Sequence, residues 1–152
     1  MEIVEYSNEL ARYFNDLNRA WLEKYFVVEP VDAEMLGNPK EYFIDKGGYI
    51  FFAKLDGEVA GTFALIKLED GVFELSKMTV NEKFQGKKIG NRMLEFCLQK
   101  AKELGAYKVI LFSNTILGPA IHLYRKYGFV EVPVGDSEYK RSNIKMEVDL
   151  TP

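Results

Sequence analysis

The chain has 152 residues, of which 47% are hydrophobic, enough for one packed domain over 1–152. Its net charge of -3 argues against non-specific nucleic-acid binding, which needs a basic surface. A single cysteine and a single histidine exclude an internal disulfide and a Cys/His zinc cluster, and we predict no metal site.

The sequence contains no hydrophobic run near the roughly 20 residues that a membrane span needs. Residues 1–6 are acidic and lack the basic-then-apolar plan of a signal peptide. We therefore expect a cytoplasmic protein with no membrane partner.

The N-terminal third predicts a strand followed by helices. Residues 3–6 have the pattern of a short strand, and Ser7 or Asn8 is a candidate N-cap. Residues 30–32 are expected in a loop, and 39–45 in a short helix ended by two glycines. The first helix is indicated by apolar residues at helical spacing: Leu10, Phe14, Leu17, Trp21 and Tyr25.

The middle of the chain predicts a meander of three strands. Strand patterns at 49–54 and 58–68 flank Asp56-Gly57, which strongly indicates a hairpin turn. Another turn precedes a third strand at 72–80. Its side chains alternate between two faces: Phe73, Leu75 and, as a candidate, Lys77 on one, and Glu74, Ser76 and Met78 on the other.

The C-terminal half alternates helices and strands, which together with the first half predicts a mixed α/β fold. A strand is expected at 107–112, a short helix at 119–127, and two strands at 129–134 and 143–150. The helix before them ends at Gly105 and is indicated by one apolar stripe: Ile89, Met93, Phe96, Cys97, Ala101 and Leu104.

The junction at 80–92 is the most informative stretch. A strand ends at Val80, and a helix is expected to begin near Gly86 to Gly90. A helix N-terminus offers unpaired N–H groups and partial positive charge, and glycines let the backbone approach an anion. Four basic residues face one acid there: Lys83, Lys87, Lys88 and Arg92 against Glu82. We predict an anion cradle; the alternative is a solvated helix start with ordinary surface lysines.

The identity of the anion is narrowed by the motifs that are missing. The nucleotide motif G-x-x-x-x-G-K-S/T does not occur, so the loop is not an ordinary P-loop. The motif G-x-G-x-x-G is absent too, which disfavours a dinucleotide.

A second motif at 120–129 follows the next predicted strand. Together with 85–90 it resembles the GNAT superfamily of acyl-CoA-dependent N-acetyltransferases. The family's signatures are Gln/Arg-x-x-Gly-x-Gly/Ala after a strand, and Ala-x-x-x-Tyr-x-x-x-Gly-Phe. The element order matches as well, so the resemblance covers nearly the whole chain. The matching residues are Gln85, Gly90, Ala120, Tyr124, Gly128 and Phe129.

The resemblance implies a fold and a cofactor site. The fold would be a single domain with a split, V-shaped mixed sheet of about seven strands flanked by helices. Acetyl-CoA would enter between the strands that end at Val80 and Phe112. Backbone groups of Met78, Thr79 and Val80 would pair with its pantetheine arm. The amides that would hold its pyrophosphate belong to Gln85, Gly86, Lys87, Lys88, Ile89 and Gly90.

Two positions depart from the family pattern. Lys88 stands where the family has its first motif glycine. Its side chain is tolerated if the residue has helical dihedral angles, and its ammonium group can then reach a phosphate. Leu117 stands where many members have an asparagine, and Asn114 nearby is a candidate substitute in cofactor binding.

Amide formation from a thioester needs a deprotonated amine, and the departing thiolate benefits from a proton. By resemblance, Tyr124 is the candidate acid and lies near the cofactor sulfur. The alternative is a core aromatic on the helical face of Leu123 and Tyr127. Glu74 is the candidate base, which in the family often acts through a water; the alternative is a solvent-facing strand glutamate.

Other reactive residues have plainer interpretations. Cys97 lies within an apolar stripe and is expected to be a buried hydrophobe, and His122 a helix-surface residue. Glu29 and Asp32 are expected in a loop as ordinary surface acids, and attraction of a cationic acceptor is the alternative. Three further residues line either the acceptor side or a solvated turn: Tyr139, Lys140 and Arg141.

The resemblance implies an N-acetyltransferase. It would transfer an acetyl group from acetyl-CoA to a primary amine of a small molecule or peptide, by direct attack in a ternary complex. Two alternatives stay open, a non-catalytic acyl-CoA-binding module and an interaction domain without ligand. The acceptor cannot be read from the sequence, and a homodimer is open because dimers are common in the family.

Overall fold

The computed structural model describes residues 1–135 and 141–151. The chain divides into two compact units, Met1–Ile66 with Lys77–Met93, and Lys67–Ser76 with Leu94–Pro152. Its strands follow the hydrogen-bonded order β1-β2-β3-β4-β5-β7-β6. The predicted mixed α/β fold, with a seven-stranded sheet and flanking helices, is confirmed. The single domain over 1–152 stays a prediction.

The first unit is built on an antiparallel sheet. Strand β2 (Tyr49–Leu55) pairs with β1 (Glu2–Glu5) on one side and with β3 (Glu58–Glu69) on the other. The turn between β2 and β3 has Asp56 at φ 53° and Gly57 at φ 80°. Two left-handed residues in a two-residue loop are the signature of a type I′ turn, so the predicted hairpin is confirmed.

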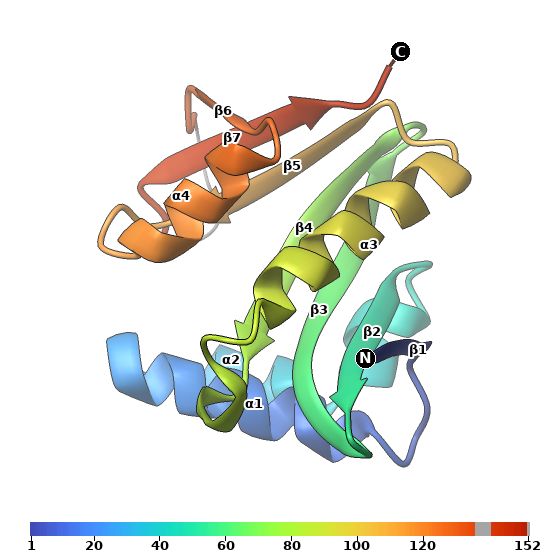
Figure 1. Ribbon diagram of the computed structural model, residues 1–152, viewed down its shortest axis with the longest axis vertical. Coiled ribbons are helices and arrows are strands. Elements are labelled where there is room, and N and C mark those ends of the chain that lie inside the picture. Colours follow the sequence, from blue (N-terminus) through green and yellow to red (C-terminus); the bar gives the residue numbers. More distant parts are fainter. Residues whose placement is uncertain (136–140, 152) are drawn as a thin grey trace. The chain divides into compact units, whose positions relative to one another are not determined.

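The helices of the first unit precede β2. Both figures place α1 and α2 on one face of β2 and β3 (Figure 1). Their bounds are Ala11–Tyr25 for α1, Pro30–Gly37 for α2 and Lys40–Ile44 for a π-helical turn, η1. The core that they form with the strands consists of Phe14, Leu22, Leu36, Phe43, Ile50, Phe52, Val59 and Ala64.

Two sequence predictions in this unit are wrong. Helix α1 is capped by Leu10, without a side-chain cap from Ser7 or Asn8. The expected loop at 30–32 is the first turn of α2. Pro30 opens this helix because a first-turn residue needs no N–H donor.

The second unit carries the rest of the sheet. The first residues of β4 (Val72–Val80) run parallel to β5 (Lys108–Ser113), with Val72 opposite Lys108 and Glu74 opposite Ile110. These two strands are therefore parallel neighbours in the sheet. Strand β7 (Ile144–Asp149) pairs antiparallel with both β5 and β6 (Val130–Val132).

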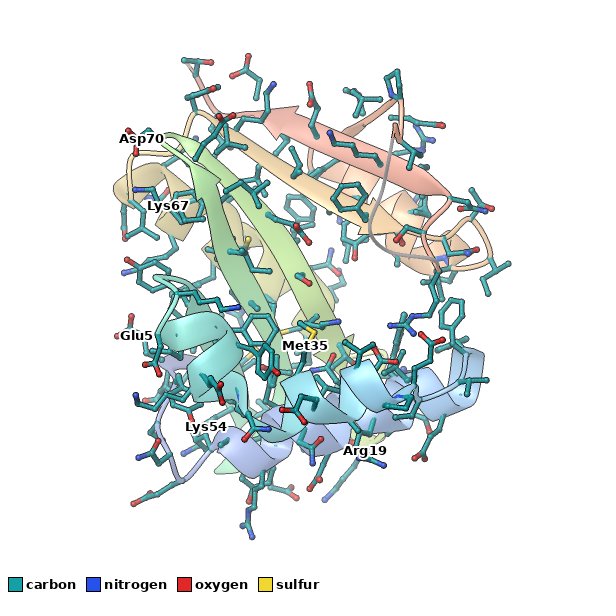
Figure 2. All side chains as sticks on the ribbon, turned by 180° about the vertical axis from the view of Figure 1, so that it is seen from behind. Glu5, Arg19, Met35, Lys54, Lys67 and Asp70 are labelled. Carbon is teal, nitrogen blue, oxygen red and sulfur yellow. The ribbon has the colours of Figure 1, made fainter. Side chains whose placement is uncertain are left out.

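Two helices lie on one face of β5 and β7 (Figure 1). They are α4 (Gly118–Lys126) and the part of α3 (Ile89–Glu103) that begins at Leu94. The buried residues of α3 and of this sheet face are Leu94, Cys97, Ala101, Val109, Leu111, Ile144, Met146 and Val148. At the turn into β4, Lys67 and Asp70, labelled in Figure 2, form an exposed ion pair of 3.3 Å.

No helix within 1–135 and 141–151 combines the length and apolar character that a membrane span requires.

Candidate active site

The loop that follows β4 prepares the start of α3. A short 3-10 turn, Glu82–Phe84, is capped by Asn81, whose side-chain oxygen accepts a hydrogen bond from the Lys83 amide at 3.0 Å. The Phe84 ring is buried and anchors the turn. Gly86 follows at φ 82°, exposed to solvent and with no heavy atom within 4 Å of a Cβ built on it. The backbone here is open to a ligand.

The first amides of α3 are available for an anion. Arg92 N–H donates to the carbonyl of Lys88 at 3.2 Å, so Lys88 is the residue that begins the helical hydrogen-bond pattern. By helix geometry, the N–H groups of the next residues, 89–91, have no carbonyl acceptor in their own helix. They add to the positive end of the helix dipole.

Lys88 has a left-handed backbone, with φ 59°. The condition of helical dihedral angles, under which a side chain is tolerated here, is therefore not met. Glycine adopts this conformation without cost, whereas a residue with a Cβ is strained there by about 1 kcal/mol or more. This strain explains physically why a glycine would suit the position.

The positive charge of the loop is smaller than the sequence indicates, and more localised. Lys83 Nζ lies 2.8 Å from Glu58 Oε1, and Glu82 Oε1 lies 2.6 Å from Lys24 Nζ. Both ion pairs are exposed and contribute little to stability. Within the described residues, no carboxylate pairs with the remaining basic residues of the loop and first helical turn: Lys87, Lys88 and Arg92.

Strand β4 is irregular before the cradle. Lys77 has φ 57°, a left-handed residue inside a strand. The left-handed residue interrupts the regular alternation of faces, and the faces assigned to Lys77 and Met78 stay a prediction. Thr79 is buried, while Met78 and Val80 keep partial exposure. Their backbone pairing with a pantetheine arm stays a prediction.

Glu74 is buried in the second unit, with 4% of its surface exposed. The solvent-facing alternative is therefore wrong. It lies in register with Ile110 of β5. A glutamate is rarely buried unless it is paired, and its role as a base stays a prediction.

Tyr124 lies on α4, with its ring centroid 5.8 Å from that of Phe129. Burial of the phenol raises the pKa of Tyr124 to about 12, with a smaller contribution from the charge of Cys97. The residue as a whole is nevertheless partly exposed. No hydrogen-bond acceptor for its hydroxyl occurs among the residues that the structure describes. The hydroxyl is thus protonated at neutral pH and can donate.

Asn114 organises the loop after β5. Its side-chain amide donates to the carbonyl of Arg141 at 2.7 Å, and its side-chain oxygen accepts from the Ile116 amide at 3.0 Å. These two bonds occupy half of the amide's hydrogen-bonding capacity. Its role in cofactor binding stays a prediction. Tyr139 and Lys140 lie outside the described residues.

Two acids expected in a loop have a structural role instead. Glu29 is the N-cap of α2, and its N–H donates to Asp32 Oδ2 at 2.9 Å in a capping box. Asp32 is buried, with 4% exposed. The predicted loop placement of Asp32 is therefore wrong, and with it the alternative that Asp32 attracts a cationic acceptor from a loop.

Cys97 is fully buried on α3, and burial raises the pKa of its thiol. A thiol that resists ionisation is a poor nucleophile, in agreement with the prediction of a buried hydrophobe. Groups of three or more His, Cys, Asp or Glu suited to a metal ion do not occur in the described part of the chain.

The sequence analysis missed the partners that set the charge of the cradle. Lys83 and Glu58 are 25 positions apart, and Lys24 and Glu82 are 58 apart. No local pattern links residues at such separations, since only the fold of the first unit brings them together.

Comparisons with known proteins agree with this architecture. The model of the acetyltransferase (GNAT) family matches residues 10–129. An IAA acetyltransferase of Azospirillum brasilense is 30% identical over 130 residues, which are 85% of this chain and 77% of that protein.

Two solved structures are similar in fold. A GNAT-family acetyltransferase of Staphylococcus aureus Mu50 superposes with a TM-score of 0.87 at 21% identity, over 99% of both chains. A Salmonella typhimurium protein, solved with its cofactor acetyl-CoA, has a TM-score of 0.77 at 18% identity, over 100% of this chain and 95% of that one.

Proposed function

The chain belongs to the acetyltransferase (GNAT) family, and from that premise we propose that it transfers an acetyl group from acetyl-CoA to a primary amine. The acceptor is a small molecule or a peptide. The observation that carries the proposal is the cradle, defined as residues 85–90, where an exposed glycine turn leads into the N-terminus of α3.

The cradle suits a pyrophosphate on three counts. It has open backbone at Gly86, helix amides without an internal acceptor, and lysines without a carboxylate partner in the described chain. In our proposal the amides of Gln85, Gly86, Lys87, Lys88, Ile89 and Gly90 bind the pyrophosphate. Backbone groups of Met78, Thr79 and Val80 bind the pantetheine arm. The bound cosubstrate supplies an activated acyl group as a thioester.

Two side chains handle protons in this proposal. Glu74, directly or through a water, takes a proton from the acceptor amine, whose nitrogen then bonds to the acyl carbon. As the carbon–sulfur bond breaks, Tyr124 gives its phenolic proton to the sulfur. The bonded nitrogen gives up its second proton to the Tyr124 phenolate, directly or through solvent, and solvent accepts the proton held by Glu74. The balance needs no covalent acyl-enzyme and no other reactant.

The proposal is tested by two measurements on the same protein. Calorimetry gives the affinity for acetyl-CoA, and a thiol-reactive dye follows CoA release with a panel of amines. Tight binding with amine-dependent release is the expected result. Binding without release for any amine would identify a non-catalytic acyl-CoA-binding module, and absence of binding would contradict both functions.

A further inference from the structure

The second unit has one sheet face that its own helices leave uncovered. Figure 2 shows β5 and β7 from the side opposite to α3 and α4, and no described helix of that unit lies in front of them. Side chains in register on neighbouring strands point to the same face. Glu74 lies opposite Ile110, and Ile110 opposite Glu147, so these three form one row across this face, in which Glu74 and Ile110 are buried.

The next row of this face contains Lys145. Phe112, two residues beyond Ile110, lies opposite Lys145, and Lys145 lies opposite Val132 of β6. The ammonium nitrogen of Lys145 is 5.7 Å from the centroid of the Phe112 ring. Lys145 is partly buried and is flanked in both directions by apolar side chains.

The charge of Lys145 is not balanced by an acid of the described chain. The one acid beside it on the same strand face, Glu147, has its Oε2 atom 3.6 Å from Lys108 Nζ. No ion pair of Lys145 with a described residue is present. A cation–π contact orients an ammonium group but leaves its charge uncompensated. A partly desolvated cation of this kind favours an anionic ligand.

We propose that Lys145 binds a carboxylate on the acceptor, which makes the acceptor an amino-carboxylate and not a polyamine. This inference rests on the proposed function, in which Glu74 receives the proton of the acceptor amine. Lys145 and Glu74 are two strand spacings and two residues apart on one face, roughly 12 Å between Cα atoms. In the proposal, a small amino-carboxylate bridges the ends of these two long side chains.

The test compares acceptors that differ only in the charge of one group. ω-Amino carboxylates of increasing chain length are each assayed against the corresponding carboxamide, with saturating acetyl-CoA. For wild type we expect kcat/KM to be about 10- to 100-fold higher for the carboxylate at the best chain length, as a charged hydrogen bond would give. Lys145→Met should abolish this preference with little change for the carboxamide, and Lys145→Arg should retain most of it.

The matched control is Lys126→Met. Lys126 on α4 also contacts an aromatic ring, with its Nζ atom 5.7 Å from the Tyr127 centroid. The substitution Lys126→Met should leave the preference for carboxylates unchanged. Unfolding temperatures of all variants test for loss of the fold.

The outcomes separate the inference from the proposed function. An active wild type without preference for carboxylates, or an equal preference in Lys145→Met, would overturn the inference and leave the acetyltransferase proposal intact. Calorimetry of the same acceptors with the protein–CoA complex provides a readout without turnover. Weaker carboxylate binding in Lys145→Met supports the inference there, and equal binding overturns it.

Discussion

The hydroxyl of Tyr124 can be removed without changing the ring that packs against Phe129. In Tyr124→Phe we expect kcat to fall on the order of 10- to 1000-fold, as for the loss of a positioned acid. The affinity for acetyl-CoA should change little, because the proton is needed as the thiolate leaves. Steady-state kinetics with calorimetry checks both. Normal turnover in this variant would make Tyr124 a core aromatic, and a joint loss of affinity and thermal stability would indicate packing alone.

Glu74 is the residue whose charge matters most to the proposed proton path. Glu74→Gln keeps the shape of the side chain and removes the proton acceptor. We expect lower kcat at neutral pH, with partial recovery as pH rises, because more of the acceptor amine is then already deprotonated. Glu147→Gln is the matched control, since Glu147 is a carboxylate of the same sheet face paired with Lys108. A pH–rate profile identical to that of wild type would place the base elsewhere.

At the scale of elements, the cradle depends on charge as well as on backbone shape. Asp and Asn have the same size, and both tolerate a left-handed backbone such as that of Gly86. Gly86→Asp and Gly86→Asn therefore differ mainly in charge. We expect Gly86→Asp to weaken CoA binding well beyond tenfold, which is about 1.4 kcal/mol, and Gly86→Asn to weaken it less. If calorimetry gave equal affinities for the two variants, the pyrophosphate would not bind at this loop.

The packing of β3 against the start of α3 depends on a missing side chain. A Cβ on Gly61 would lie 2.9 Å from Met93 Sδ and 3.0 Å from the backbone oxygen of Thr79. We expect Gly61→Ala to reduce the free energy of unfolding by about 1 to 3 kcal/mol, because the added methyl group would overpack the site. Gly118→Ala is the control, since nothing lies within 4 Å of its added Cβ. Chemical denaturation measures both, and equal losses would contradict the packing argument.

For the whole molecule, the fold was predicted mainly from the periodic spacing of apolar residues. The strand Val72–Val80 has the predicted bounds, and α3 begins at Ile89, the first residue of the predicted apolar stripe. Such patterns work because strands and helices bury one face each. The hairpin at Asp56-Gly57 was readable for a different reason, since its two residues tolerate left-handed backbone.

Other features depend on contacts between residues that are distant in sequence. One feature, helix α2, had a local sequence signature that the prediction overlooked. The left-handed conformation of Lys77 has no local signature, because lysine does not favour it. Helix α2 did have a signature, with Pro30 at its first position and Asp32 completing a capping box with Glu29. The burial of Glu74 follows from its position in the sheet, which strand alternation alone does not reveal.

The central claim, acetyl transfer to an amine from acetyl-CoA held by the cradle, is tested most directly by the product itself. Mass spectrometry of the reaction mixture measures N-acetylated acceptor, and a thiol assay measures free CoA in the same sample. We predict equal molar amounts of the two for wild type, and a matched decrease of both in Gly86→Asp at limiting acetyl-CoA. CoA release without N-acetylated product for any amine, or product formation unaffected by Gly86→Asp, would contradict the account.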